Sequence, residues 1–427
     1  MRCGANGETK AREKTLRKAR NLSGTLVIGG GQAAAQLAIS LRAGGYSAPL
    51  RILGREAELP YQRPPLSKGF LRHDISEAQL ELRPADFWSA QHIEVLRNIQ
   101  AISIDRDRKQ VTCADDSQWP YDHLVLATGS RNRVLSLEGH NADGVFSLRS
   151  LEDARRLREA FADARNVVVI GGGFIGLEFA AMARKLGRFV TIIEMADRLM
   201  ARAVGAQISE WYLHMHADHG ADVRLRSGVK ALNVQAGRIV SVTLTDETTL
   251  PCDLLVYGIG AMANLELAKA CGLETGAGIR VNAFMQSADP HVLAIGDCAE
   301  APNSYFHAGA FVRLESVQNA VDQAKCAAET IMGAPRAFDV VPWFWSDQFE
   351  AKLQIAGLSS GATQQVLRGA PETGRFSVFY FMTDRLIAVD SVNMASDHLI
   401  ARRLLAAGRS LTPQQAGDPQ FNLKALL

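Results

Sequence analysis

Two glycine-rich turns in this sequence have the spacing of a phosphate-binding loop. Gly29, Gly31 and Ala34 fit G-x-G-x-x-G/A directly after the apolar run of residues 25–28. The first small residue allows a tight turn, the second lets a pyrophosphate approach the backbone, and the third allows close helix–strand packing. The free N–H groups at the start of the following helix would bind the anion. The alternative is a plain turn that joins a strand to a helix.

A second glycine-rich turn of the same type argues against a chance match to the motif at the first turn. Gly171, Gly173 and Gly176 give a full G-x-G-x-x-G after the apolar run of residues 167–170. Two such fingerprints indicate two bound dinucleotides, or two halves of one enzyme that binds two of them.

An acidic residue follows the second fingerprint at the distance expected for a ribose contact. The apolar run of residues 189–193 ends at Glu194, 18 positions after Gly176. A carboxylate there accepts from a ribose 2′-OH and repels a 2′-phosphate, so NADH is favoured over NADPH. Arg198 and Arg202 follow closely and are candidates for contact with the pyrophosphate, or alternatively with a 2′-phosphate, which would weaken the preference for NADH. The structural alternative for Glu194 is a surface carboxylate at a strand end.

The corresponding place after the first fingerprint departs from this pattern. Arg55 follows the second apolar run, and Glu56 comes only after it. Glu56 is our candidate for the ribose of the first dinucleotide, with a solvated loop charge as the alternative.

Two further charged residues are candidates for a functional role, one because a stiff loop could position it and one because its burial in an apolar helix would be costly. Prolines stiffen residues 60–68 and favour an extended segment that could hold Lys68 against a cofactor ring. The alternative, which composition alone favours, is a plain turn before a helix at residues 66–71. Glu178 lies early on an otherwise apolar helix, where burial without a partner is costly.

Composition restricts the class of protein. The chain has 427 residues, 47% of them hydrophobic, with a formal net charge of +2, and no run of about 18 apolar residues. Residues 1–20 carry a net charge of +5 and have no apolar core, so we expect residues 1–22 to be a disordered basic leader. No nucleic-acid or membrane partner is expected.

The spacing of the cysteines in the sequence does not predict a metal site or a disulfide framework. The six thiols contain no C-x-x-C pair, which predicts neither a zinc site nor a disulfide framework and fits a reducing cytoplasm. No metal site is expected. A flavoprotein that reduces disulfides needs a vicinal dithiol, and the sequence has none.

The order of predicted elements indicates an α/β protein with an added α+β unit. Strands and helices alternate around each fingerprint, and residues 80–123, including residues 93–95, suit an antiparallel excursion. Strands near residues 352–357, 376–381 and 385–392 precede a C-terminal helix. We predict a first dinucleotide-binding domain at 23–135 with 262–336, a second at 136–261 and a C-terminal domain at 337–427.

The run Pro60-Tyr61-x-Arg63-Pro64-Pro65-Leu66-Ser67-Lys68 resembles FAD-dependent ferredoxin reductases of the putidaredoxin reductase and biphenyl dioxygenase reductase type. The resemblance extends from about residue 24 to the end. It implies a glutathione-reductase-like two-dinucleotide-binding fold with an α+β C-terminal reductase domain. It also implies that Lys68 pairs with Glu178 near the reactive flavin nitrogen, although a structural salt bridge at a domain interface is the alternative.

The resemblance distributes site residues over both cofactors. Trp345, or else Trp343, would line the flavin, unless these are buried core aromatics. Residues expected to bind FAD are Gly29, Gly31, Ala34, Glu56, Arg63, Lys68, Ala127, Thr128, Gly129, Asp297, Val317 and Trp345. Residues expected to bind NAD are Gly171, Gly173, Phe174, Ile175, Gly176, Glu178, Glu194, Arg202 and Gly260.

The implied activity is hydride transfer from NADH to FAD, followed by single-electron transfer to a [2Fe–2S] ferredoxin that serves a Rieske oxygenase or a cytochrome P450. Such a component belongs to aromatic hydrocarbon catabolism, and we expect a monomer or weak homodimer. Arginines near the flavin edge would steer the acidic ferredoxin, with Arg63, Arg72, Arg83 and Arg313 as candidates. The alternatives are an NADH oxidase, a rubredoxin or nitrite reductase component, or an NADH-sensing flavoprotein like apoptosis-inducing factor.

Overall fold

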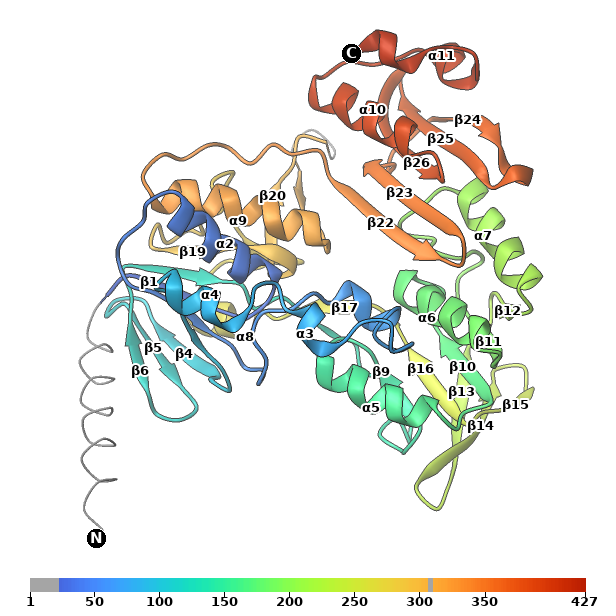
Figure 1. Ribbon diagram of the computed structural model, residues 1–427, viewed down its shortest axis with the longest axis horizontal. Coiled ribbons are helices and arrows are strands. Elements are labelled where there is room, and N and C mark those ends of the chain that lie inside the picture. Colours follow the sequence, from blue (N-terminus) through green and yellow to red (C-terminus); the bar gives the residue numbers. More distant parts are fainter. Residues whose placement is uncertain (1–22, 306–309) are drawn as a thin grey trace. The chain divides into compact units, whose positions relative to one another are not determined.

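The computed structural model describes residues 23–305 and 310–427, so the leader expected at residues 1–22 and Cys3 lie outside the described residues. The described chain divides into two compact units (Figure 1). The first contains the chain up to Tyr61, Glu81–Ser130 and Ala263–Asp339, and the second contains Gln62–Leu80, Arg131–Met262 and Val340–Leu427. No helix in the described ranges is both long and apolar enough to cross a membrane.

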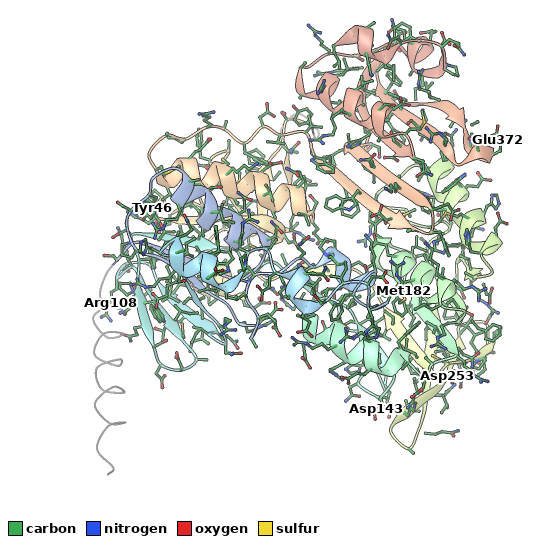
Figure 2. The ribbon with its side chains drawn as sticks, in the orientation of Figure 1. Tyr46, Arg108, Asp143, Met182, Asp253 and Glu372 are labelled. Carbon is green, nitrogen blue, oxygen red and sulfur yellow. The ribbon has the colours of Figure 1, made fainter. Side chains whose placement is uncertain are left out.

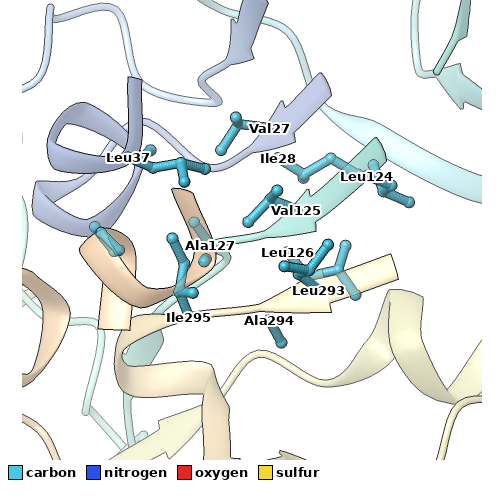
Figure 3. Close-up of a cluster of buried hydrophobic side chains, with 14 of the residues drawn as sticks. Val27, Ile28, Leu37, Leu124, Val125, Leu126, Ala127, Leu293, Ala294 and Ile295 are labelled. Carbon is cyan, nitrogen blue, oxygen red and sulfur yellow. The ribbon is translucent and has the colours of Figure 1, made fainter. Parts of the chain in front are cut away.

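The first unit is built on a five-stranded parallel sheet in the order β19-β7-β1-β2-β3. The β-branched and leucine-rich strands β1, β2, β7 and β19 are almost entirely buried, as parallel strands usually are, whereas the edge strand β3 is partly buried (Figure 3). Helix α2 packs beside α9. The bounds are β1 (Thr25–Ile28), α2 (Gln32–Ala43), β2 (Leu50–Leu53), α4 (Ala85–Ala90), β3 (Glu94–Leu96), β7 (His123–Leu126), β19 (Val292–Ala294), η2 (Gly296–Cys298) and α9 (Val317–Ile331).

Two small sheets and one short helix complete this unit. Strands β4, β5 and β6 form an antiparallel sheet, and β20 pairs with both β18 and β21. The bounds are β4 (Ala101–Asp105), β5 (Gln110–Cys113), β6 (Gln118–Pro120), α8 (Glu266–Ala270), β18 (Ile279–Arg280), β20 (Ala299–Pro302) and β21 (Phe311–Val312).

The second unit repeats the same parallel arrangement in the order β12-β11-β10-β16-β9. Asp253 joins the starts of two of these strands, because its Oδ2 accepts from the backbone N–H of Asn166 at 2.7 Å (Figure 2). The bounds are β9 (Val145–Ser147), α5 (Leu151–Phe161), β10 (Asn166–Ile170), α6 (Phe174–Lys185), β11 (Phe189–Ile193), α7 (Ala206–Asp218), β12 (Asp222–Arg224) and β16 (Leu254–Tyr257).

The rest of the second unit is antiparallel. One three-stranded sheet is β13-β14-β15, and the C-terminal sheet has the order β22-β23-β26-β25-β24 with α10 packed on it. The bounds are η1 (Pro64–Ser67), α3 (Glu77–Leu80), β13 (Val229–Gln235), β14 (Arg238–Leu244), β15 (Thr249–Pro251), β22 (Trp343–Gln348), β23 (Ala351–Gly357), β24 (Gln364–Ala370), η4 (Pro371–Thr373), β25 (Arg375–Met382), β26 (Arg385–Val392), α10 (Ala395–Ala406), α11 (Pro413–Gly417) and η5 (Leu423–Leu426). Strands β8 (Ser130–Asn132) and β17 (Ala261–Ala263) pair with each other where the chain passes between units.

Two sequence predictions about local structure were wrong. Residues 93–95 do not belong to an antiparallel excursion: β3 pairs in parallel with β2 at the sheet edge, which three-residue alternation cannot reveal. Residues 64–67 are a 3₁₀ turn rather than extended, and residues 66–71 are not an α-helix. Prolines at the first two helical positions supply a helical φ, and Lys68 donates its backbone N–H to the Pro65 carbonyl at 3.1 Å.

Candidate functional site

The first glycine turn has the geometry of an anion cradle. Gly29 has φ +119°, and a Cβ there would lie 2.0 Å from the carbonyl oxygen of Ala127. Nothing lies within 4 Å of a Cβ built at Gly31, whereas the side chain of Ala34 is fully buried. Gly31 also begins α2 without a side-chain cap, so the first N–H groups of the helix have no acceptor from a capping side chain. The turn is therefore fixed by packing but open where a phosphate would lie.

The second turn repeats this division of roles. A Cβ at Gly171 (φ +104°) would lie 2.6 Å from the Gly258 carbonyl oxygen, and one at Gly176 would lie 2.2 Å from that of Gly171. A Cβ at Gly173 would meet nothing within 4 Å, and Gly173 begins α6 without a side-chain cap. Two predicted NAD residues follow Gly173. The ring centroid of Phe174 lies 4.6 Å from that of Phe344, and the side chain of Ile175 is 43% exposed.

Glu194 is held rigidly beside this turn. Its Oε2 accepts from the backbone N–H of Gly172 and its Oε1 from that of Ala196, both at 2.7 Å. These bonds fix the plane of the carboxylate at the end of β11. A half-buried anion in a fixed orientation suits a hydroxyl donor and disfavours a phosphate.

The two arginines after Glu194 differ in availability. Arg198 donates to the carbonyl oxygens of Val204 and Ala201 at 2.7 and 2.6 Å, so it serves its own loop. Arg202 is exposed, and its Nη2 lies 3.6 Å from a Cβ built at Gly260. The structure thus brings two of the predicted NAD residues together.

The carboxylate of Glu178 is buried in the second unit and has partners from two other segments. Lys68 Nζ lies 2.9 Å from Glu178 Oε1, and the side chain of Glu178 is 8% exposed. Ser346 donates to the same oxygen at 2.7 Å, and Ser67 donates to Oε2 at 2.8 Å. Asp347 Oδ2 is 3.9 Å from Lys68 Nζ. The loop at η1, helix α6 and strand β22 therefore meet at one ion pair.

Burial and these donors act on Glu178 in opposite directions. Burial raises the pKa of Glu178 because it penalises the charged form, while Lys68, Ser346 and Ser67 favour that form. The three donors offset the cost of removing the carboxylate from water.

The other predicted FAD residues lie mostly in the first unit, at the ends of its parallel strands. Ala127 follows β7, the Thr128 hydroxyl donates to the Asn264 carbonyl at 2.9 Å, and Gly129 has φ +64°. Asp297 lies in η2, where its Oδ2 accepts from Ser130 Oγ at 2.9 Å. Val317 is the first residue of α9.

Three other residues predicted to contact the flavin, Arg63, Lys68 and Trp345, belong to the second unit. Arg63 donates to the Arg149 carbonyl at 2.7 Å. Trp343 and Trp345 are both half-buried, with ring centroids 5.5 Å apart.

Trp343 is engaged within the C-terminal fold, since the Arg402 guanidinium lies 4.4 Å from its ring centroid. In the first unit, Glu56 accepts from the Tyr61 hydroxyl at 2.6 Å, a contact with its own loop.

Sequence reasoning missed the hydroxyls that bind Glu178. Ser67 precedes Lys68 directly, and Ser346 lies in the aromatic-rich run of β22. Nothing in either motif says that two serines 279 positions apart meet one carboxylate, because that depends on how η1 and β22 pack on α6.

Comparison with known proteins agrees with this geometry. Residues 24–324 match the family model described as pyridine nucleotide-disulphide oxidoreductase, and residues 343–427 match the reductase C-terminal model. The chain belongs to the pyridine nucleotide-disulphide oxidoreductase family. Its cofactors are accordingly FAD and a reduced pyridine nucleotide.

Individual relatives indicate which kind of oxidoreductase within the family this chain is similar to. Rhodocoxin reductase of Rhodococcus erythropolis is 45% identical over 399 residues, 93% of each chain. A ferredoxin reductase structure from Rhodopseudomonas palustris has a TM-score of 0.92 at 43% identity, covering 94% of this chain and 100% of that one. A covalent putidaredoxin reductase–putidaredoxin complex has a TM-score of 0.92 at 37% identity, covering 95% and 98%. The predicted fold and the resemblance to ferredoxin reductases are confirmed.

The two later glycines of the second turn give a matched pair of substitutions. Gly173→Ala is expected to change the free energy of unfolding by less than about 0.5 kcal/mol but to weaken pyridine-nucleotide binding at least about tenfold, because the methyl group would occupy the open phosphate position. Gly176→Ala is expected to cost about 1–3 kcal/mol, because its methyl group would clash with the Gly171 carbonyl. Denaturant unfolding and NADH titration measure both effects. Unchanged NADH affinity in Gly173→Ala would contradict the assignment.

Proposed function

We propose that this protein is an NADH-dependent ferredoxin reductase whose [2Fe–2S] ferredoxin serves a Rieske oxygenase or a cytochrome P450. The observation that carries the proposal is the Lys68–Glu178 pair at 2.9 Å, in a chain with two open phosphate-binding turns. The electron carriers named for the similar proteins, rhodocoxin and putidaredoxin, support a ferredoxin partner.

Bound FAD supplies the chemistry, because it accepts two electrons as a hydride and releases them singly. The chain supplies binding and electrostatics. The turns at Gly31 and Gly173 would hold the pyrophosphates, and Asp297 would accept from a flavin side-chain hydroxyl. Lys68 would place a positive charge beside the ring, and Glu178 holds the ammonium in position.

The cysteines argue against thiol-based alternatives. Of the five in the described ranges, four are buried, and Cys271 is half-buried. Cys298 lies next to Asp297 but is fully buried, which raises the pKa of its thiol. An NADH oxidase with a reactive cysteine is therefore disfavoured. A rubredoxin reductase and an NADH-sensing flavoprotein remain the alternatives that the partner assay below separates.

We further propose the domain boundaries, the cellular location, the oligomeric state and the kind of pathway that the sequence suggested. The FAD domain is 23–135 with 262–336, the NAD domain is 136–261, and the C-terminal domain is 337–427. The protein works in the cytoplasm as a monomer or weak homodimer, in aromatic hydrocarbon catabolism.

The first test is the absorption spectrum of the purified protein, followed by anaerobic titration. We expect a flavin spectrum that NADH bleaches, and iron–sulfur reduction when a [2Fe–2S] ferredoxin is added. A rubredoxin in place of the ferredoxin is the control. Bleaching by NADH with no transfer to any ferredoxin would contradict the proposed partner but not the cofactors.

The fixed carboxylate beside the second turn predicts the nucleotide preference. Glu194→Ala should lower the preference for NADH over NADPH in kcat/KM by at least about tenfold, because the hydroxyl acceptor and the repulsion of a 2′-phosphate are both lost. Glu210→Ala, an exposed carboxylate on α7, is the matched control. An unchanged ratio of kcat/KM values would rule out this role for Glu194.

Charge steering of the ferredoxin is also testable. Arg72 and Arg83 are exposed, although Arg72 pairs with Asp74 at 2.6 Å, while Arg63 and Arg313 are only partly exposed. We expect the second-order rate of ferredoxin reduction to fall about tenfold between low and high ionic strength, and Arg72→Glu to flatten that dependence. Stopped-flow measurement in a salt series checks this, and a flat profile for the unmodified protein would remove the steering proposal.

A further inference from the structure

A buried chain of hydrogen bonds leads away from the Glu178 carboxylate. Ser346 Oγ lies 2.7 Å from Glu178 Oε1, and Gln348 Nε2 lies 3.2 Å from Ser346 Oγ. His216 Nε2 lies 2.9 Å from Gln348 Oε1. Ser346, Gln348 and His216 are all 1% exposed or less. The chain therefore runs from strand β22 to helix α7 without reaching solvent.

The direction of every hydrogen in this chain follows from the carboxylate at its end. An ionised carboxylate accepts and cannot donate, so the Ser346 hydroxyl must donate to Glu178. Its oxygen then accepts from Gln348, which turns the amide nitrogen toward Ser346 and the amide oxygen toward His216. His216 must in turn carry its hydrogen on Nε2.

Two observations independent of the carboxylate support this direction. Gln348 Nε2 also lies 3.9 Å from the Met200 sulfur, which can accept but not donate, so the amide nitrogen faces that side. His216 Nδ1 is buried, and no hydrogen-bond partner for it is present in the described chain. An unpaired acceptor nitrogen costs less there than an unpaired N–H group would.

The charged and titratable groups around the chain are few. Lys68 follows η1, and Asp347 comes from β22. The pKa of the Tyr212 phenol on α7 is raised by burial first, and then by the charges of Asp347, Glu178, Asp390 and Glu350. Burial lowers the pKa of His216 to about 4, with a smaller contribution in the same direction from His219 of the same segment. The imidazole is therefore neutral at physiological pH, and one of its nitrogens is free to be the donor that the chain requires.

We propose that His216, Gln348 and Ser346 form a one-directional positioning chain that keeps Glu178 ionised and aimed at Lys68. In this arrangement the three residues act through Glu178, as positioning residues. Protonation of Glu178 would remove the anion that holds the Lys68 ammonium, and it would allow the whole chain to reverse. The role given to Lys68 rests on the proposed function, whereas the direction of the chain does not.

The first readout is the tautomer of His216, measured by NMR on FAD-loaded protein labelled with ¹⁵N-histidine. We expect an Nε2–H signal from His216 that is identified by its loss in His216→Phe. Gln348→Met, which preserves length but cannot accept from the imidazole, should abolish or shift that signal. An Nδ1–H tautomer in the unmodified protein would overturn the proposal.

The second readout is the pH profile of flavin reduction by NADH in single turnover, with no ferredoxin present. Loss of one hydrogen bond to a charged group raises the carboxyl pKa, so Ser346→Ala should move the acid limb of the rate upward by about one pH unit. The rate falls as pH decreases through the pKa of Glu178, so a higher pKa moves that fall to higher pH. The dissociation constant for NADH should change less than about twofold.

Ser391→Ala is the matched control, because Ser391 is a fully buried serine of the same sheet that bonds to Ser377 and not to the chain. It should leave the acid limb in place. Gln348→Glu preserves shape but draws the Ser346 hydroxyl away from Glu178, so it should move the limb as Ser346→Ala does. An acid limb that stays fixed in Gln348→Glu and Ser346→Ala would overturn the proposal. Failure to reduce ferredoxin would affect only the proposed function.

Discussion

The arrangement of the second unit depends on one buried charge. Glu178 places a carboxylate on an apolar helix at 7% exposure, and burial of an unpaired carboxylate in a protein interior would be strongly destabilising. The partners come from two segments that are far apart in the sequence: Ser67 and Lys68 from the loop at η1, and Ser346 from β22. Satisfying this carboxylate therefore fixes how the proline loop and the first C-terminal strand pack on helix α6.

The two glycine turns at the ends of the parallel sheets have the same distribution of crowded and open positions. In each, the first glycine of the turn is required because a carbonyl from the neighbouring strand exit leaves no room for a Cβ. The second glycine faces open space in both turns, so packing within the described chain does not require a glycine there. The structure thus distinguishes the glycines that packing requires from those that it does not, which a sequence motif alone cannot do.

The family takes its name from disulphide chemistry, but the described part of this chain is not built for it. Cys298 occupies the place after the Gly296–Asp297 turn, yet it is fully buried and donates to the carbonyl oxygens of Leu126 and Ile295. A thiol held in this way is a poor nucleophile. The similar proteins are named for separate carriers, rhodocoxin and putidaredoxin, rather than for a disulphide substrate.

The sequence by itself determined the features that arise from local spacing. Both glycine turns, the strands that lead into them, Glu194 at a strand end and the identity of Lys68 all follow from residues within about 20 positions of one another. The pairing of Lys68 with Glu178 came from family resemblance, because no local pattern joins residues 110 positions apart.

Only the tertiary structure decided what depends on packing between distant segments. It placed β3 in the parallel sheet and brought Ser67 and Ser346 onto one carboxylate. It also joined His216 to that carboxylate through Gln348. The sequence shows that a serine side chain can donate a hydrogen bond. Which acceptor it meets depends on the packing of whole strands and helices.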